Sequence, residues 1–429
     1  MKKLLKNIVV TILIWEAKQV LKKYQPTIIV VAGDVGKTTT KDAVYAALKN
    51  SKKARKSEKS LNSETGLPLS ILGAQSGWSS PQAWFSIILK GFRLITKTQS
   101  YPELLILELG DRKPGDSKFL AEWIKPDIVI LTHVDDIPTH VEFFDSIEGS
   151  RKEKQDILEA MKQDGVVIVN SDDANALTIL EEAKRTDLEV VTYGESPADV
   201  TITGCNIASL SEGLGMEVAV DIQKHQISYA IPGYLGKGVV LASAAAIGAA
   251  GVLDVSLDEA IVSLGEEPDL PKGRLRAIPG VKRSIVIDDT YNAGFASTKL
   301  ALETLKNTPG KRHIAVLADM LELGSHSAKA HKQIGEFTPA YCDMLVVVGE
   351  QARIIADAAR SQMGAKKIFT FSNSREAGKF VEQMIEPGDV VLIKGSQGLR
   401  MERATQEVML HPEQREKLLV RQEKEWLRR

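Results

Sequence analysis

The stretch TIIVVAGDVGKTTT at residues 27–40 combines an apolar run, a turn that contains two glycines and the start of a helical pattern. The apolar run predicts a buried strand, and the turn after it leads into a helix. Such a turn presents backbone N–H groups to an anion at a helix N-terminus. Lys37 would reach terminal phosphates, and the Thr38 hydroxyl would ligate magnesium. The segment therefore predicts an ATP phosphate loop formed by Gly33, Val35, Gly36, Lys37, Thr38 and Thr39.

Two details of this loop depart from the standard Walker pattern, G-x-x-x-x-G-K-[ST]. Val31 occupies the place of its first glycine, so strand and helix context must support the interpretation. Asp34 adds an acid within the loop. An acid there repels phosphate unless its carboxylate points away or caps the following helix.

Length and composition narrow the class of protein. A chain of 429 residues is too long for one ordinary core and predicts two or three domains. The 55 basic and 56 acidic side chains nearly cancel, which argues against a dedicated nucleic-acid binder. Cys205 and Cys342 lie far apart, so neither a disulfide framework nor a zinc site is indicated. A reducing cytoplasm fits this composition best.

The N-terminus carries lysines before an apolar stretch at residues 8–15. The stretch is too short to span a bilayer and stops at Glu16, and no small-residue cleavage site follows. The pattern therefore predicts neither export nor a transmembrane helix. Two interpretations of an amphipathic helix within residues 1–26 stay open. It docks on the protein's own body, which is favoured, or it lies peripherally on the inner face of the membrane.

Beyond residue 27, apolar runs alternate with helical periods, which is typical of an α/β fold with a mostly parallel sheet. Strands are predicted at residues 104–107, 128–131 and 166–169. Residues 200–230 alternate over short stretches, with Gly213 and Gly215 at a hairpin, and predict antiparallel strands appended to this sheet. The Ala-rich residues 241–250 predict a buried helix.

A polar segment with proline and glycine at residues 266–273 predicts a domain boundary, because the strand–helix rhythm restarts after it. We expect a short N-terminal helix at 1–26, a central P-loop-type ATP-binding domain at 27–268 and a C-terminal Rossmann-like domain at 269–429. Strands of the last part are predicted at residues 284–287, 313–317, 344–348 and 390–393. The final twenty residues are charged and predict a solvated helix.

Several polar residues follow predicted strands at the sheet edge where α/β proteins bind ligands. Glu108 ends the strand at 104–107, and its carboxylate either holds magnesium or only caps the surface. His140 follows the strand at 128–131. Asp289 and Asn292 follow the strand at 284–287, where they bind nucleotide, orient substrate or only shape the turn.

The motifs taken together resemble the Mur ligase family, and within it the branch that adds D-alanyl-D-alanine to the muramoyl tripeptide. The resemblance runs from about residue 28 to about residue 405. It is specific because the pieces occur in the right order over most of the chain. Beyond GDVGKT at 33–38, they are Asn62 with GLPL at 66–69, ELG at 108–110, His140 with Lys154, KGRL at 272–275, DDTYNA at 288–293, DMLELG at 319–324 and KGS at 394–396.

This resemblance implies roles for individual residues. Thr38, Glu108, His140 and Lys154 would serve the magnesium ions, with Lys154 carbamylated in the family. From the residues alone, the run at 151–154 is equally a solvated charged helix face, and Lys152 is a competing register. The other implied roles are contact with the γ-phosphate for Arg274, and substrate contacts for Asn62, Lys394 and Ser396.

Two departures from the family affect the substrates. The adenine signature G-x-H-N-x-x-N-A reads GKGVVLAS at residues 236–243, without the histidine and both asparagines. Only about 26 residues precede the first predicted strand, which leaves no room for the family's N-terminal UDP-binding domain. We therefore expect an acyl substrate that lacks UDP, is lipid-linked or is positioned by another protein.

The implied reaction is ATP- and magnesium-dependent amide formation through an acyl phosphate, in cell-wall precursor or related peptide synthesis. The expected substrates are a small-molecule or lipid-linked carboxylate and an amino acid or dipeptide, with no nucleic acid. The two isolated cysteines argue against the family variant that is partnered with a glutaminase. Two rivals remain open: a simple NTPase switch, and a non-catalytic nucleotide-binding scaffold, the latter prompted by Asp34 and the lost adenine signature.

Overall fold

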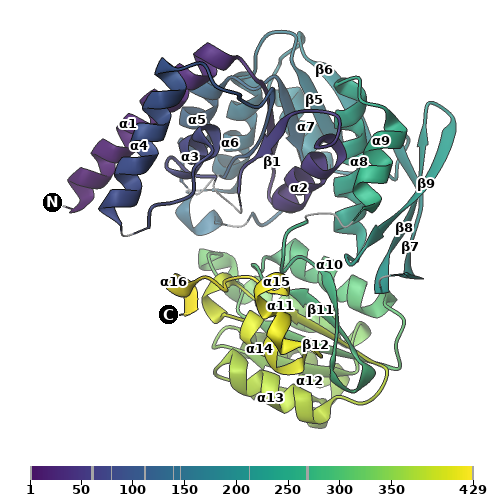
Figure 1. The fold of residues 1–429 in the computed structure, drawn as a ribbon. Coiled ribbons are helices and arrows are strands. Elements are labelled where there is room, and N and C mark those ends of the chain that lie inside the picture. Colours follow the sequence, from purple (N-terminus) through teal and green to yellow (C-terminus); the bar gives the residue numbers. More distant parts are fainter. Residues whose placement is uncertain are drawn as a thin grey trace.

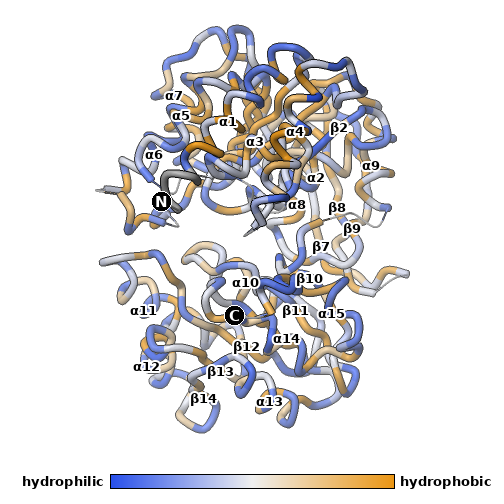
Figure 2. Tube along the Cα trace, turned by 60° about the vertical axis from the view of Figure 1, so that its left-hand side comes forward, coloured by the Kyte–Doolittle hydropathy of each residue, from blue (hydrophilic) through white to orange (hydrophobic). Residues whose placement is uncertain are grey.

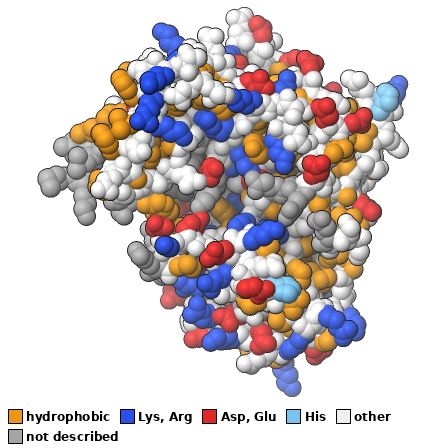
Figure 3. Space-filling view, in the orientation of Figure 1, with side chains coloured by type: hydrophobic (Ala, Val, Ile, Leu, Met, Phe, Trp, Pro, Cys, Tyr) orange, Lys and Arg blue, Asp and Glu red, His pale blue; other side chains and the backbone are white. Residues whose placement is uncertain are grey.

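The chain folds into two lobes, one above the other in the computed structural model (Figure 1). The structure describes residues 2–58, 62–78, 80–110, 113–138, 140–144, 146–211, 213–266 and 270–427, with side chains from residue 7 onward. Charged side chains of both signs are interspersed over the face shown in Figure 3. This distribution agrees with the formal net charge of −1.

The first lobe is built on a nine-stranded sheet of order β2-β3-β1-β4-β5-β6-β7-β8-β9. Strands from β1 to β6 pair in parallel, and β7, β8 and β9 form an antiparallel extension. Their bounds are β1 (Thr27–Ala32), β2 (Ala54–Lys56), β3 (Leu104–Glu108), β4 (Ile128–Leu131), β5 (Val166–Asn170), β6 (Glu189–Gly194), β7 (Val200–Leu210), β8 (Gly213–Ile222) and β9 (His225–Pro232).

Helices cover both faces of this sheet. Alternate residues of β1 enter opposite cores: Ile29 and Val31 pack on the α2 and α8 side, and Val30 packs on the side of α1 and α3. Two-sided burial explains the continuous apolar runs of the central strands. The helices are α1 (Lys2–Tyr24), α2 (Lys37–Leu48), α3 (Gly66–Leu72), α4 (Pro81–Thr96), α5 (Asp116–Ile124), α6 (Ile147–Glu159), α7 (Ala174–Glu182), α8 (Lys237–Val252) and α9 (Leu257–Gly265).

The second lobe has a six-stranded sheet of order β10-β11-β15-β12-β13-β14, in which only β10 is antiparallel to its neighbour. Its strands are β10 (Arg276–Pro279), β11 (Ile285–Asp289), β12 (Arg312–Ala318), β13 (Met344–Val348), β14 (Ile368–Phe371) and β15 (Asp389–Lys394). Its helices are α10 (Phe295–Asn307), α11 (Ser327–Phe337), α12 (Ala352–Met363), α13 (Ser374–Met384), α14 (Glu402–Val408), α15 (Arg415–Leu418) and α16 (Lys424–Leu427).

Single 3₁₀ turns lie between the helices and strands. They are η1 (Val141–Phe143), η2 (Val281–Arg283), η3 (Gly324–His326), η4 (Thr338–Ala340), η5 (Ala365–Lys367), η6 (Gln397–Leu399) and η7 (Pro412–Gln414). Of these, η1 of the first lobe contacts η3 of the second, so the two lobes touch next to the loop that carries His140.

These sheets and helices confirm the predicted α/β fold class, the short N-terminal helix and the antiparallel extension. Sequence reasoning missed β2, β6, β10 and β14, which are short or lie on partly exposed parts of the sheets. The predicted boundary between residues 268 and 269 lies outside the described residues. The division into three parts therefore remains a proposal.

The prediction of a solvated helix over the last twenty residues is wrong. The chain folds back in short turns, and Leu419 is buried in the apolar core beneath α13 and α14. Arg421 is also buried, and it donates hydrogen bonds to the Thr290 carbonyl at 2.9 Å and to Glu402 at 3.1 Å. Burial of these residues outweighs the solvation that their charged neighbours favour.

The N-terminal helix α1 packs on the first lobe, as the favoured interpretation predicted. Leu13, Ala17 and Val20 are buried against α3, α4 and the sheet. Figure 2 brings α1 and α4 forward and shows hydrophobic residues along both. Across the part of the chain that the structure describes, no helix has the length and apolar character needed to cross a bilayer.

Candidate active site

A cavity of about 520 Å³ opens where the two lobes meet. The register of the first sheet positions one of its walls, because Val31 of β1 pairs with both Glu108 of β3 and Ile130 of β4. The loops after these neighbouring parallel strands therefore emerge at the same edge. Residues of the second lobe close the opposite wall, among them Arg274, Asn292 and Ser396.

The predicted phosphate loop lies between β1 and α2. Gly33 and Gly36 have φ angles of 128° and 92°, in the left-handed region that favours glycine. A Cβ atom on Gly33 would also lie 2.2 Å from the Thr132 hydroxyl, so the turn needs glycine there. Because α2 begins at Lys37, its first backbone N–H groups are turned toward the loop. The Lys37 ammonium contacts the carbonyl of Gly33.

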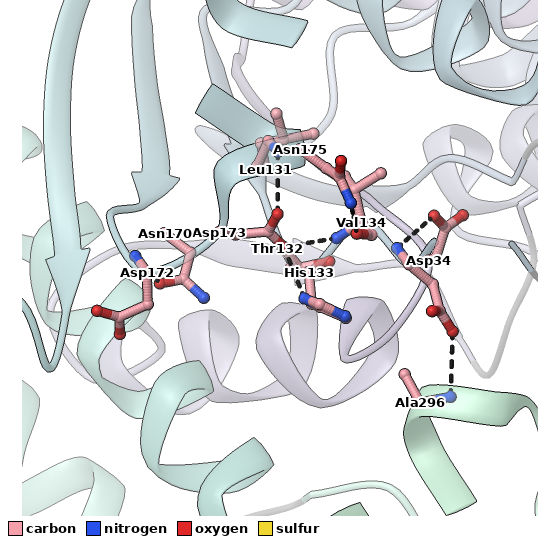
Figure 4. A network of polar contacts seen from close by, with 12 residues as sticks. Asp34, Leu131, Thr132, His133, Val134, Asn170, Asp172, Asp173, Asn175 and Ala296 are labelled. Carbon is pink, nitrogen blue, oxygen red and sulfur yellow. Dashed lines mark hydrogen bonds and ion pairs between the residues drawn. The ribbon is translucent and has the colours of Figure 1, made fainter. Parts of the chain in front are cut away.

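The acid inside this loop lines the cavity, but its carboxylate is buried and paired. The Asp34 carboxylate lies 2.7 Å from the Lys154 ammonium, and both side chains are 1% exposed. Its other oxygen accepts a hydrogen bond from the Asp135 backbone N–H at 3.0 Å. Figure 4 shows Asp34 directed toward the loop that follows β4. The ion pair offsets the repulsion that the sequence predicted between Asp34 and phosphate.

Lys154 reaches the loop from the buried face of α6. Its ammonium also donates to the Ser150 hydroxyl at 3.1 Å. The solvated-face interpretation of residues 151–154 is wrong for this residue, because Glu153 and Lys154 are buried together with Ile157. Lys152 is exposed instead and pairs with Asp156 at 3.1 Å, so the competing register does not contact the loop.

Oxygen atoms gather around Glu108 at the end of β3. The buried carboxylate accepts hydrogen bonds from the Thr38 hydroxyl at 2.9 Å and from the Asn62 amide at 3.0 Å. A carboxylate and a hydroxyl side by side in a polar cavity suit Mg²⁺, which prefers oxygen ligands and retains waters or phosphate oxygens. Thr38 and Glu108 thus fit a magnesium ion. Among the described residues, no group of three or more His, Cys, Asp or Glu side chains converges on a metal position.

His140 lies on the cavity wall but faces the other lobe. It adopts a left-handed backbone conformation (φ 72°) before η1, and its imidazole contacts Glu322 of the second lobe. A second link joins the lobes nearby, where the Asp135 carboxylate accepts a hydrogen bond from the Ala296 backbone N–H at 3.1 Å. The two contacts hold α10 and the loop after β12 against the loop after β4.

A partly buried polar network supports the loop after β4 (Figure 4). His133 lies 2.6 Å from Asp173, and this hydrogen bond raises the pKa of His133. Burial alone would raise the pKa of Asp173, but hydrogen bonds from His133 and from the backbone N–H groups of Ala176 and Val134 outweigh it and lower that pKa. The network anchors the strand end from which Asp135 and His140 extend.

The second lobe contributes a cation and an aromatic ring. The Arg274 guanidinium lies 4.3 Å from the centre of the Tyr291 ring, a cation–π distance, and both residues line the cavity. Ser396 also lines it, and its hydroxyl accepts a hydrogen bond from the Leu321 backbone N–H at 2.9 Å. Arg274 thus presents a fixed positive charge opposite the phosphate loop.

Lys394 and Asp289 lie behind this wall. Their side chains are buried, pair at 2.7 Å, and Lys394 also donates to the Asn292 carbonyl at 3.0 Å. Burial lowers the pKa of Lys394, and the attraction of Asp289 opposes that effect. The pair fixes the turn that carries Asn292 into the cavity.

The cavity collects most of the candidate residues. Those that line it are Val35, Gly36, Lys37, Thr38, Asn62, Glu108, His140, Arg274, Asn292 and Ser396. Five others support the lining from behind: Gly33, Thr39, Lys154, Asp289 and Lys394. The roles of individual residues in chemistry remain predictions.

Sequence reasoning missed part of the lining. Tyr291 and Glu322 lie within the quoted runs 288–293 and 319–324, so a closer reading of those runs would have found them. Arg400 and Trp426 carry no local signal. They meet because the Arg400 guanidinium donates to the Trp426 carbonyl at 2.8 Å, a contact that only the folded C-terminus creates.

The segment that departs from the adenine signature begins α8. Gly236 precedes the helix with φ 84°, and Lys237 pairs with Glu195 at 2.5 Å. Residues 236–243 are absent from the described lining of the cavity. The structure therefore assigns this segment no contact with the cavity.

Comparisons with known proteins agree with this architecture. Residues 31–250 match the Mur ligase middle domain, and residues 273–397 match the Mur ligase glutamate ligase domain. The UDP-N-acetylmuramoyl-tripeptide–D-alanyl-D-alanine ligase of Bacillus subtilis is 26% identical over 399 residues, covering 92% of this chain and 79% of that protein. The Escherichia coli enzyme of the same name is 26% identical, covering 89% and 77%. A MurF ligase from Thermotoga maritima, solved with ADP, superposes with a TM-score of 0.75 at 25% identity, covering 93% and 83%.

Proposed function

Because this chain belongs to the Mur ligase family, we propose that its inter-lobe cavity activates a substrate carboxylate with ATP and passes the acyl group to an amine. The protein is an ATP-dependent, ADP-forming carboxylate–amine ligase of peptidoglycan precursor synthesis. One observation carries the assignment: Lys37, Thr38 and Glu108 of the first lobe share a cavity with Arg274 of the second.

The reaction that we propose has two steps. The substrate carboxylate attacks the γ-phosphorus of ATP, ADP leaves, and an acyl phosphate forms. The neutral amine then attacks the acyl carbon, and the tetrahedral intermediate expels phosphate and loses a proton to give the amide. Lys37 and Arg274 stabilise the negative charge that develops on the transferred phosphoryl group and on the expelled phosphate.

Magnesium is the cofactor that the oxygen ligands favour. We propose that Thr38 and Glu108 would hold the magnesium ion. The bound ion would neutralise negative charge on the phosphates. Asn62 fixes the Glu108 carboxylate through its amide. Closure of the lobes excludes the water that would hydrolyse an acyl phosphate.

A second metal position would take His140 and, only in its carbamylated form, Lys154, since the ammonium of the unmodified lysine is a cation. In the structure that ammonium is paired with Asp34. A carbamate on Lys154 would place a second negative charge beside the Asp34 carboxylate. The modified lysine would therefore have to move away from Asp34. We propose that the unmodified lysine instead acts through Asp34, by fixing the phosphate loop.

The names of the relatives support a proposal for the substrates. We propose a muramoyl tripeptide, linked to UDP or to lipid, as the acyl donor and D-alanyl-D-alanine as the amine. Asn62, Asn292 and Ser396 line the cavity with polar groups suited to these peptides, and Asp289 and Lys394 hold that wall in place. We place the reaction in the cytoplasm.

Lys37→Ala tests the proposal. With ATP, magnesium and both substrates, we expect amide formation, followed by mass spectrometry, to fall about a hundredfold or more, because one charge-stabilising group is removed. Lys332→Ala on the exposed face of α11 is the matched control and should retain activity.

The wild-type protein also distinguishes the rivals. Phosphate release that rises only when carboxylate and amine are both present supports the ligase. Constant hydrolysis without substrates would indicate an NTPase switch. A calorimetric titration that detects binding of ATP and magnesium, without phosphate release under any of these conditions, would indicate a nucleotide-binding scaffold.

A further inference from the structure

The outer surface of α1 carries exposed apolar and basic residues. The helix buries Leu13, Ala17 and Val20 and presents Ile8 and Trp15 on its opposite side. Lys18 and Lys22 continue this exposed stripe toward the end of the helix. The spacings of seven, three and four residues place the stripe on one side of the helix.

Helix α4 repeats this arrangement beside α1. It buries Ile87 and Leu94 and exposes three large apolar side chains. Phe85 is 63% exposed and Phe92 is 54% exposed, comparable to Trp15 at 51%, and Leu89 lies between the two phenylalanines. Scattered exposed apolar residues are ordinary, but aromatic residues aligned on two neighbouring helices form a patch.

The two helices form one rigid surface. The Lys23 ammonium donates hydrogen bonds of 2.9 Å to the carbonyls of Leu94, Ile95 and Lys97 at the end of α4. The hydroxyl of Tyr24 donates to the same Leu94 carbonyl at 3.0 Å. We call Ile8, Trp15, Lys18, Lys22, Phe85, Leu89, Lys90, Phe92, Arg93 and Lys97 the α1–α4 face; all of them are exposed.

The charge of this face has one sign. Its ionisable residues are Lys18, Lys22, Lys90, Arg93 and Lys97. The only acidic residue in either helix is Glu16, which is 1% exposed and lies against Gly91. The whole chain has a formal net charge of −1, so this excess of positive charge is local. Figure 3 shows hydrophobic and basic side chains side by side over the region of α1 and α4.

We propose that the α1–α4 face docks on the surface of an anionic lipid bilayer. Aromatic side chains prefer the interface between headgroups and acyl chains, and lysines and arginines reach the anionic headgroups beside them. The combination of both features selects a bilayer over a purely apolar partner. Because no described helix can cross a bilayer, both helices would lie in the plane of the surface.

Docking by this face leaves the catalytic cavity accessible. In Figure 1, α1 and α4 lie on the outer side of the upper lobe, and the cavity lies between the lobes. The proposal rests on surface residues alone and is independent of the proposed reaction. Together with that reaction, it would bring the cavity close to membrane-bound acyl donors.

Vesicle co-sedimentation tests the proposal with the full chain. We expect binding to vesicles of phosphatidylglycerol and phosphatidylcholine, at least tenfold weaker binding to pure phosphatidylcholine, and weaker binding at high salt. The triple variant W15S/F85S/F92S and the charge variant K22E/K97E should each lower binding at least tenfold. Val262→Ser, an exposed apolar residue on α9, is the control and should bind like the wild type.

Other outcomes would overturn the proposal. Wild-type binding by the triple variant would show that the aromatic residues do not contact lipid. If inositol hexakisphosphate displaces the protein from vesicles while the triple variant still binds them like the wild type, the result would indicate a binding site for soluble phosphate compounds. If the wild type self-associates without sedimenting on vesicles and the triple variant abolishes that self-association, the result would identify a second copy of the chain as the partner of the α1–α4 face. Circular dichroism of each variant confirms that it is folded.

Discussion

At the scale of single residues, Asp34 shows how a local conflict is resolved by a distant partner. An acid in a phosphate loop is unfavourable by itself. Lys154, 120 positions later in the numbering, lies 2.7 Å from it, and both side chains are buried. Breaking such a buried pair leaves an uncompensated charge, so the two residues are expected to depend on each other.

Asp34→Asn should lower the free energy of unfolding by about 3 kcal/mol, because the Lys154 ammonium loses its counter-charge in a buried position. Lys154→Met should be similarly destabilising, and the double variant should recover part of the loss. Urea unfolding of the four proteins gives the coupling energy. If Asp34→Asn instead stabilises the protein, Lys154 carries a negative carbamate, and ¹³C-labelled bicarbonate would reveal it by NMR.

At the scale of elements, the contact between α1 and α4 contains a buried acid. Glu16 faces Gly91, where a Cβ atom would lie 2.2 Å from the Glu16 carboxylate, so α4 approaches α1 closely only because residue 91 is glycine. One Glu16 oxygen is buried without a hydrogen-bond partner in the described structure. Desolvation by burial raises the pKa of Glu16 to about 7. The helix pair is therefore sensitive to the protonation of this residue.

Glu16→Gln should stabilise the protein above pH 7 and change its pH dependence. The native state of the wild type binds a proton more tightly than the unfolded chain, so its stability should fall as the pH rises from about 4.5 to about 7. At pH 8 the variant should gain about 2 kcal/mol. Urea midpoints at pH 5 and pH 8 check this. Glu122→Gln, exposed on α5, is the control; an equal gain at both pH values would contradict the prediction.

At the scale of the whole molecule, polar contacts between described residues join the lobes around the cavity. His140 contacts Glu322, and the Ala296 N–H donates to Asp135. Gly324 of the second lobe lies close to Glu142 of the first. A Cβ atom added to Gly324 would lie 2.8 Å from the Cβ atom of Glu142. This arrangement lets the lobes approach closely where the phosphate loop and Arg274 face each other.

Glu322→Ala should favour an open arrangement of the lobes. A partly exposed polar contact contributes about 1 kcal/mol, which corresponds to about a fivefold shift in population. Small-angle scattering without nucleotide should therefore give a larger radius of gyration for the variant. Glu336→Ala, exposed on α11, is the control. Identical scattering curves for Glu322→Ala and the wild type would show that the contact does not hold the lobes together.

Much of the site could be predicted because its residues lie next to regular elements. Lys37 and Thr38 begin α2 after the four-residue turn that follows β1, and Glu108 ends β3, so strand and turn patterns in the sequence locate them. Lys394 also ends a strand, but the sequence does not reveal whether its side chain enters the cavity. The structure pairs it with Asp289 behind the wall.

The sequence by itself determined the α/β fold class, the glycine-containing turn between strand and helix that we propose binds phosphate, and the family, because periodicity, turn residues and motif order are local properties of the chain. Only the tertiary structure decided where Asp34 points, that Lys154 is buried and that Trp426 reaches the cavity. These outcomes depend on packing between residues far apart in sequence. Burial changes the free energy of a charged side chain, such as that of Asp34 or Lys154, more than the residues next to it in the sequence do.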